Sequence, residues 1–252
     1  MSIRLTKIIR HPIKAHGREA LASVLLSEGR CLPYDRHWAV AHDLSKFDAE
    51  NPAWTPCSSF QRAARTPAVM AISASFDEES GLLTLTHPEL GAITFDPDAP
   101  EDAARFIAWV APISPTERFR PVALVKAPGQ GMTDSDWPSV SINNLATNAA
   151  VSQHLGQELS MYRWRGNLWI DGMPAFAEAE LIGKEVKIGE AVLRVEEPIG
   201  RCRATAINPE TGVQDADTLA ALRALCGEQN FGVVARVIRG GEIAPGDEME
   251  IL

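Results

Sequence analysis

Hydrophobic and polar residues alternate in short runs over the first 125 residues, and turn-forming residues separate these runs. A period of two is typical of strands with one buried face, so this half of the chain is predicted to form an antiparallel sheet or barrel. A hairpin is predicted where two apolar runs flank FDEESG, because Gly81 can close the turn. The predicted strands span residues 3–10, 20–27, 38–41, 68–75, 81–86 and 92–95.

Helical signals occur at three places. Residues 100–111 begin with a proline and two acidic residues, a composition typical of a first helical turn. Asn143 or Asn144 can cap a second helix that ends at Leu155, and a third helix is predicted over residues 218–226. Because a regular alternation of strands and helices is missing, the fold class is predicted to be mainly β with some α (α+β).

The length of 252 residues fits one large domain or two small ones. Residues 126–138 are dense in Gly, Pro and Asp, which predicts a loop of the kind that can line a site. We therefore predict two interlocked domains, residues 1–125 and 126–252. The boundary is soft, because one chain crossing between the halves would blur it.

The chain carries 33 acidic and 24 basic residues, a net charge of −9. This charge argues against nucleic acid or an anionic membrane surface as the main partner. Residues 1–65, with ten basic and six acidic residues, are nonetheless net positive. Such a local excess indicates either a small anionic ligand or a solvated face. The alternating charges of the amino terminus and the lack of a long apolar run predict a cytoplasmic protein.

The most informative stretch is PIGRCRATAINPETG, in which Cys202 stands between Arg201 and Arg203. Neighbouring cations favour the thiolate, which attacks electrophiles or binds a soft metal. The alternative is a small buried apolar residue at the start of a strand. The other cysteines, which are predicted to be structural, are Cys31, Cys57 and Cys226.

Two further groups of cations could hold an anion. Lys14 in HPIK and Arg36 in DRHW can present cationic heads at strand ends, and Arg163 and Arg165 share one face of an extended segment. With Asn167 close by, the latter pair forms a plausible cradle for a phosphate or a pterin, because an amide can both donate to and accept from a heterocycle edge. The alternative in each case is an exposed ion pair or a solvated cation.

The order of HPIK, DRHWAV, RGNLWIDG and GRCRATAINPETG along the chain resembles the molybdenum cofactor sulfurase C-terminal (MOSC) family with its N-terminal β-barrel domain. This group includes the mitochondrial amidoxime-reducing component. The resemblance covers nearly the whole chain, and the run at residues 201–212 is its most specific part. It implies a MOSC-like β-barrel packed on an N-terminal β-barrel-like domain, with few peripheral helices and a ligand between the two.

The resemblance also implies roles for individual residues. Cys202 corresponds to the cysteine that binds molybdenum of a pterin cofactor, and it would be the catalytic residue. Cofactor anchors of the family correspond to Lys14, Arg36, Arg165 and Asn167. Further cofactor contacts are expected from Arg201, Asp134, Ser135 and Asp136.

Some positions depart from the family pattern. Ala15 replaces a serine that contacts the phosphate in many relatives. Where relatives often have an acidic pair followed by tryptophan, this chain reads AFAEAEL, so Glu178 is kept whereas Ala179 and Leu181 are not.

The resemblance implies a molybdenum-dependent oxidoreductase that reduces N-hydroxylated or N-oxide compounds. No cysteine cluster of the ferredoxin type follows Cys202, so a separate electron donor of the ferredoxin, flavoprotein or cytochrome b5 type is expected. The alternative function is a cofactor carrier or a sulfur-relay module that holds a persulfide on Cys202. A β-rich scaffold without a ligand is the third interpretation.

Overall fold

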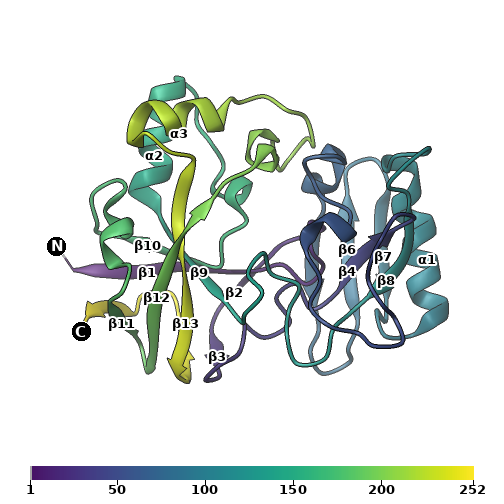
Figure 1. Ribbon diagram of the computed structural model, residues 1–252, viewed down its shortest axis with the longest axis horizontal. Coiled ribbons are helices and arrows are strands. Elements are labelled where there is room, and N and C mark those ends of the chain that lie inside the picture. Colours follow the sequence, from purple (N-terminus) through teal and green to yellow (C-terminus); the bar gives the residue numbers. More distant parts are fainter. Residues whose placement is uncertain (1) are drawn as a thin grey trace.

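A closed barrel of seven strands forms one half of the computed structural model, which describes residues 2–252 (Figure 1). The strands follow one another around the barrel in an order that differs from their order in the chain. This order is β1 (Ile3–Arg10), β10 (Leu168–Asp171), β9 (Val140–Asn144), β13 (Asn230–Arg239), β12 (Ala191–Gly200), β11 (Glu185–Ile188) and β15 (Glu248–Ile251). Strand β2 (Glu19–Leu21) extends the sheet beside β1.

Strand β1 closes this barrel. It pairs antiparallel with β10, where Ile8 faces Leu168, and antiparallel with β15, where Ile3 faces Met249. A second early strand, β3 (Val24–Leu26), pairs with β14 (Gly241–Ile243). Strands β1 and β3 come before residue 125 in the sequence, but they pair with strands that come after it. The division into two domains near residue 125 stays a prediction.

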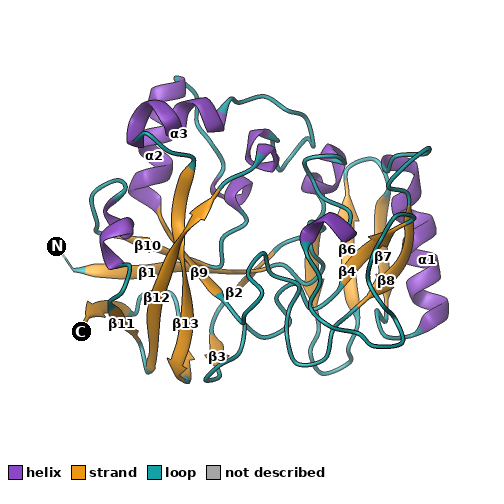
Figure 2. Ribbon diagram, in the orientation of Figure 1, coloured by secondary structure: helices purple, strands orange, loops and turns teal. Residues whose placement is uncertain are grey.

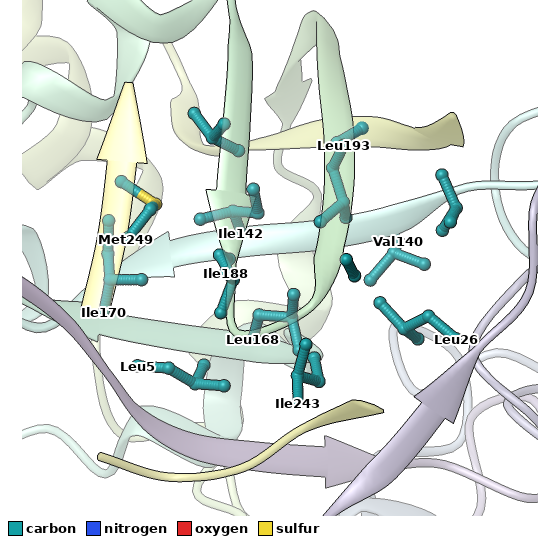
Figure 3. Close-up of a cluster of buried hydrophobic side chains, with 14 of the residues drawn as sticks. Leu5, Leu26, Val140, Ile142, Leu168, Ile170, Ile188, Leu193, Ile243 and Met249 are labelled. Carbon is teal, nitrogen blue, oxygen red and sulfur yellow. The ribbon is translucent and has the colours of Figure 1, made fainter. Parts of the chain in front are cut away.

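The barrel interior is filled by aliphatic side chains from every strand around it (Figure 3). Because side chains alternate between the two faces of a strand, one face of each strand can be apolar throughout. The side chains that meet in Figure 3 include Leu5, Leu26, Val140, Ile142, Leu168, Ile170, Ile188, Leu193, Ile243 and Met249.

The N-terminal half consists of two small sheets and one helix around a second apolar core. One sheet is the meander β5 (Ser73–Phe76), β6 (Leu83–His87) and β7 (Gly91–Phe95), and the other pairs β4 (Ala39–His42) with β8 (Pro121–Val125). Helix α1 (Pro100–Val110) packs on this core, where the rings of Phe95 and Phe106 stack with centroids 5.0 Å apart.

Two helices, α2 (Leu145–Leu155) and α3 (Thr218–Cys226), lie together at one end of the barrel (Figure 2). The Asn144 side chain caps α2 by accepting a hydrogen bond from the backbone N of Ala146 at 3.0 Å. The three predicted helices and the mainly β fold class are thereby confirmed. None of the helices in residues 2–252 has the length and apolar character needed to cross a membrane.

Some predicted elements differ from the observed ones. The strand predicted at residues 68–75 begins only at Ser73, because Pro67 starts a 3-10 helix before it. The strand predicted at residues 20–27 is divided into β2 and β3, and β8 was not predicted. The 3-10 helices of the described chain are Cys57–Ser59, Pro67–Ala71, Ala111–Ile113, Met161–Trp164, Ala177–Leu181 and Arg203–Ala206.

Shortening a side chain in the barrel core should make the folded protein less stable. Leu168 is fully buried on β10, so Leu168→Ala is expected to lower the free energy of unfolding by about 2–5 kcal/mol through lost burial and a cavity. Leu25, which is 64% exposed on β3, is the matched control. Leu25→Ala should change the free energy of unfolding by less than about 0.5 kcal/mol. Urea denaturation measures both variants, and equal values would contradict this account of the core.

Candidate functional site

A cavity of about 410 Å³ is lined by residues from both halves of the chain. Lys14, Arg36 and Gln61 come from the first half, whereas Arg165 and Cys202 come from the second. Its volume lies in the range of small-molecule and cofactor sites, which occur preferentially between domains. Residues predicted from separate motifs therefore meet at one place.

The seam between β1 and β10 brings two of these motifs together. The strands are antiparallel, so the end of β1 lies beside the start of β10. The backbone N of Ile9 donates to the carbonyl of Asn167 at 2.7 Å. Lys14 follows β1 and Arg165 precedes β10, so closing the barrel places both segments at the same end of the seam.

Lys14 is 7% exposed, which contradicts the alternative of a solvated lysine. Its Nζ donates to the carbonyl of Met132 at 2.7 Å and to Asp134 Oδ1 at 2.6 Å. The ammonium lowers the pKa of Asp134. Asp134 and Ser135 line the cavity, whereas Asp136 is not among the lining residues.

Arg36 belongs to an ion pair whose acid is completely enclosed. Its Nη1 donates to Asp35 and its Nη2 donates to the carbonyl of Arg165 at 2.6 Å. Burial alone would raise the pKa of Asp35, but Arg36 and His11 hold it well below its usual range. Arg36 is therefore fixed in place, and the alternative of a surface ion pair does not hold.

Arg163 lies in the 3-10 helix Met161–Trp164 and Arg165 follows it in a left-handed conformation, so the extended segment predicted for them is wrong. Nη2 of Arg163 pairs with Asp215 at 2.6 Å, but other N–H groups of the two arginines are unused. Nε and Nη1 of Arg163 and Nη2 of Arg165 are buried without a partner in the described part of the chain. Burial, reinforced by the neighbouring Arg36, lowers the pKa of Arg165 to about 9. An anion in the cavity would accept hydrogen bonds from the unpaired N–H groups, and its negative charge would reduce the repulsion between the cations.

Cys202 carries a free thiol, is exposed and lines the cavity. The preceding Arg201 is anchored by hydrogen bonds from its guanidinium to the carbonyl of Trp164 at 2.7 Å, the carbonyl of Phe231 and Asn143 Oδ1. Burial lowers the pKa of Arg201 to about 9. Because most of its N–H groups are used inside the protein, Arg201 fixes the backbone that presents the thiol.

Asn167 also lines the cavity, but its amide is largely committed. Its Oδ1 accepts from the backbone N and the hydroxyl of Ser141 at 3.2 and 2.9 Å, and its Nδ2 donates to the carbonyl of Ile9 at 3.2 Å. These contacts tie β9 to the seam of β1 and β10. One N–H of the amide is left for a ligand.

Sequence reasoning missed a wall of the cavity formed by residues 57–64. Cys57, predicted to be structural, lines the cavity together with Gln61 and Arg62. Nη1 of Arg62 lies 3.8 Å from Cys57 Sγ. No motif marks this segment, because it reaches the site only through the packing of the first half against the second.

Three lining residues other than glycine have left-handed backbone conformations. Ala15, Arg36 and Arg165 have φ values of 67°, 47° and 49°. Each costs about 1–2 kcal/mol, and such strain gathers at functional sites where the surroundings enforce it. Ala15 offers no hydroxyl here, in line with its departure from the family pattern.

Glu178 lies outside the lining of this cavity. It is buried, accepts hydrogen bonds from Thr147 at 2.8 Å and from Asn144 Nδ2 at 3.1 Å, and borders a separate cavity of about 250 Å³. Ala179 borders the same separate cavity, and Leu181 is part of the barrel core.

Residues 134–250 match the MOSC domain family. The crystal structure of the YuaD protein from Bacillus subtilis has the same fold, with a TM-score of 0.50 and 14% identity over 100% of this chain and 96% of that one.

Two curated sequence relatives are molybdenum cofactor sulfurases of fruit flies. The protein of Drosophila grimshawi is 28% identical over 169 residues, which are 62% of this chain and 21% of that protein. The protein of Drosophila ananassae is 29% identical over 119 residues, or 44% and 15%. This chain therefore matches about a fifth or less of the length of these relatives.

Acid should destabilise the fold through a histidine beside the cavity. Burial lowers the pKa of His16 from 6.5 to about 4, so between these values the unfolded chain binds a proton that the folded chain excludes. Stability should therefore fall as the pH drops from about 6.5 to 4, by on the order of 3 kcal/mol from this residue.

Urea denaturation at pH 7 and pH 5 measures about half of this loss, roughly 2 kcal/mol. His16→Gln should lose less stability over the interval than the wild type, although His11, whose pKa burial also lowers, retains part of the effect. His154→Gln is the control, because His154 is exposed on α2. An unchanged loss in His16→Gln would contradict the assignment.

Proposed function

We propose that this protein binds a molybdenum-pterin cofactor in the 410 Å³ cavity, with Cys202 as the molybdenum ligand, and reduces N-hydroxylated or N-oxide compounds. The observation that carries the proposal is an exposed free thiol in the wall of a cavity that Lys14, Arg36 and Arg165 also line. The match of residues 134–250 to the MOSC domain supports a function related to the molybdenum cofactor.

The donor set fits the two chemically distinct ends of such a cofactor. The unpartnered N–H groups of Arg163 and Arg165 suit a phosphate, because guanidinium groups bind phosphate oxygens through paired hydrogen bonds. A thiolate suits molybdenum, because soft sulfur donors favour soft metals. Within residues 2–252 no group of three or more His, Cys, Asp or Glu side chains is arranged to hold a metal, so Cys202 would be the protein's ligand to a metal that the pterin also holds.

Lys14 can bind a phosphate if its partner Asp134 moves away. The Asp134 side chain is 85% exposed in its ion pair with Lys14. It can therefore turn into solvent and leave the buried ammonium to an anion, with little loss from breaking a contact with an exposed carboxylate. The Arg36–Asp35 pair is enclosed and keeps its geometry, so Arg36 contributes a fixed positive charge.

In this proposal the bound cofactor supplies the two-electron chemistry that removes an oxygen atom from the substrate. The chain's own part is to hold the phosphate and to present the exposed Cys202 sulfur from the backbone that Arg201 anchors. Electrons would come from a separate ferredoxin, flavoprotein or cytochrome b5 type of protein.

A second candidate function is a sulfur relay with a persulfide on Cys202. The observation that favours it is a second free thiol, Cys57, which lines the same cavity. The curated relatives, named as molybdenum cofactor sulfurases, are compatible with such a role.

The metal site is tested by molybdenum per chain, measured by elemental mass spectrometry after production in a host that makes the pterin cofactor. We expect near-stoichiometric molybdenum in the wild type and at least about a tenfold loss in Cys202→Ala, because the sulfur ligand is gone. Cys226→Ala is the matched control, since Cys226 is also free and exposed but does not line this cavity. Metal absent from the wild type would overturn the proposal.

The two candidate functions differ in turnover. A reductase, supplied with a chemical reductant, should convert an amidoxime or hydroxylamine, whereas a relay should show a persulfide on Cys202 in metal-free protein by mass spectrometry. Transfer of sulfur by a Cys202→Ser variant would exclude the relay. A loaded wild type that converts none of these substrates would exclude the reductase.

A further inference from the structure

Gln61 is a polar residue in the cavity wall whose amide is incompletely bonded. It is 2% exposed and lines the cavity, and its Nε2 has no hydrogen-bond partner among the described residues. Its Oε1 lies 3.1 Å from Nε2 of the buried His16. A buried amide group without a partner is costly, so a ligand in the cavity is the available partner.

The protonation of His16 decides which amide atom faces that ligand. His16 Nδ1 lies 2.9 Å from the carbonyl of Lys14, which can only accept, so Nδ1 carries the hydrogen. His16 is neutral near pH 7, because burial lowers its pKa to about 4. Its Nε2 then has a lone pair and needs a donor. The Gln61 amide must turn its NH₂ group toward His16, and its oxygen takes the position that has no partner.

We propose that Gln61 presents its carbonyl oxygen to an N–H group on the heterocycle of the bound ligand, and that His16 is the positioning residue that sets this orientation. The inference rests on the proposed function, since it concerns the pterin of the same cofactor. The amide contact with the heterocycle was expected from Asn167. Because Oδ1 of Asn167 already accepts hydrogen bonds from Ser141, we assign the acceptor role to Gln61 instead.

Charge complementarity supports an acceptor at this place. Donors from Lys14, Arg36, Arg163 and Arg165 suit the anionic end of the ligand, and the carboxylate of Asp134, which also lines the cavity, is engaged by Lys14. A pterin ring also carries N–H donors, which these cations cannot satisfy. A neutral acceptor meets that need without bringing a negative charge near the phosphate. Ligands of the same charge that lack an N–H edge should therefore bind less well.

The test measures pterin per chain, as its fluorescent oxidation product, through repeated gel filtration of the holoprotein. Gln61→Leu should lose pterin at least about tenfold faster than the wild type, because the N–H would be buried without an acceptor. Gln61→Glu keeps an acceptor and should retain more than Gln61→Leu. Gln130→Leu is the matched control, because Gln130 Nε2 is also buried without a partner but does not line this cavity.

A second measurement is independent of the cofactor. Nitrogen NMR of the wild-type imidazole should show His16 with hydrogen on Nδ1, and Gln61→Glu should raise the pKa of His16 by placing a carboxylate beside Nε2. A hydrogen on Nε2 of His16 instead would overturn the proposal. Because the tautomer is measured on the wild-type protein, this result does not depend on whether a variant folds. Wild-type pterin retention in Gln61→Leu would overturn this inference alone, whereas wild-type protein without pterin would overturn the proposed function as well.

Discussion

The antiparallel seam between β1 and β10 is the interaction on which the rest of the structure depends. It closes the barrel, and it also fixes where the chain leaves β1 and enters β10. The segment with Lys14 and the segment with Arg165 are thereby held side by side, and Nη1 of Arg165 donates to the carbonyl of Gly17 at 3.2 Å. The site is thus a consequence of barrel closure, and its precision follows from a fully buried aliphatic core.

The cavity wall combines features that are unfavourable for folding. Cations are buried near one another, guanidinium N–H groups are left without partners, and Arg36 and Arg165 adopt left-handed backbone conformations. These features persist because enclosed contacts such as the Arg36–Asp35 pair hold them in place. Sites that bind a charged ligand tightly are commonly prepared in this way, since the strain is present before the ligand arrives.

Local signals explain what could be predicted from the sequence. The helices were found because their ends carry their own chemistry, such as the Asn144 cap of α2 and Gly156 after it. Lys14, Arg165 and Cys202, which line the cavity, could be singled out from the sequence because they belong to recognisable motifs. Gln61 has no such context, and the engagement of Asn167 with Ser141 depends on strands that are distant in sequence. Contacts of this kind follow from topology, which short-range patterns do not encode.

The pairing of Ile3 on β1 with Met249 on β15 has a consequence for biosynthesis. A barrel that joins positions so far apart in the chain cannot close on the ribosome until nearly all of these residues have emerged. Many of its contacts are between distant residues, which slows folding and prolongs the exposure of unpaired strand edges. The nascent chain would thus lack a closed barrel until β15 has emerged, and any ligand that needs the closed barrel would be bound late in folding.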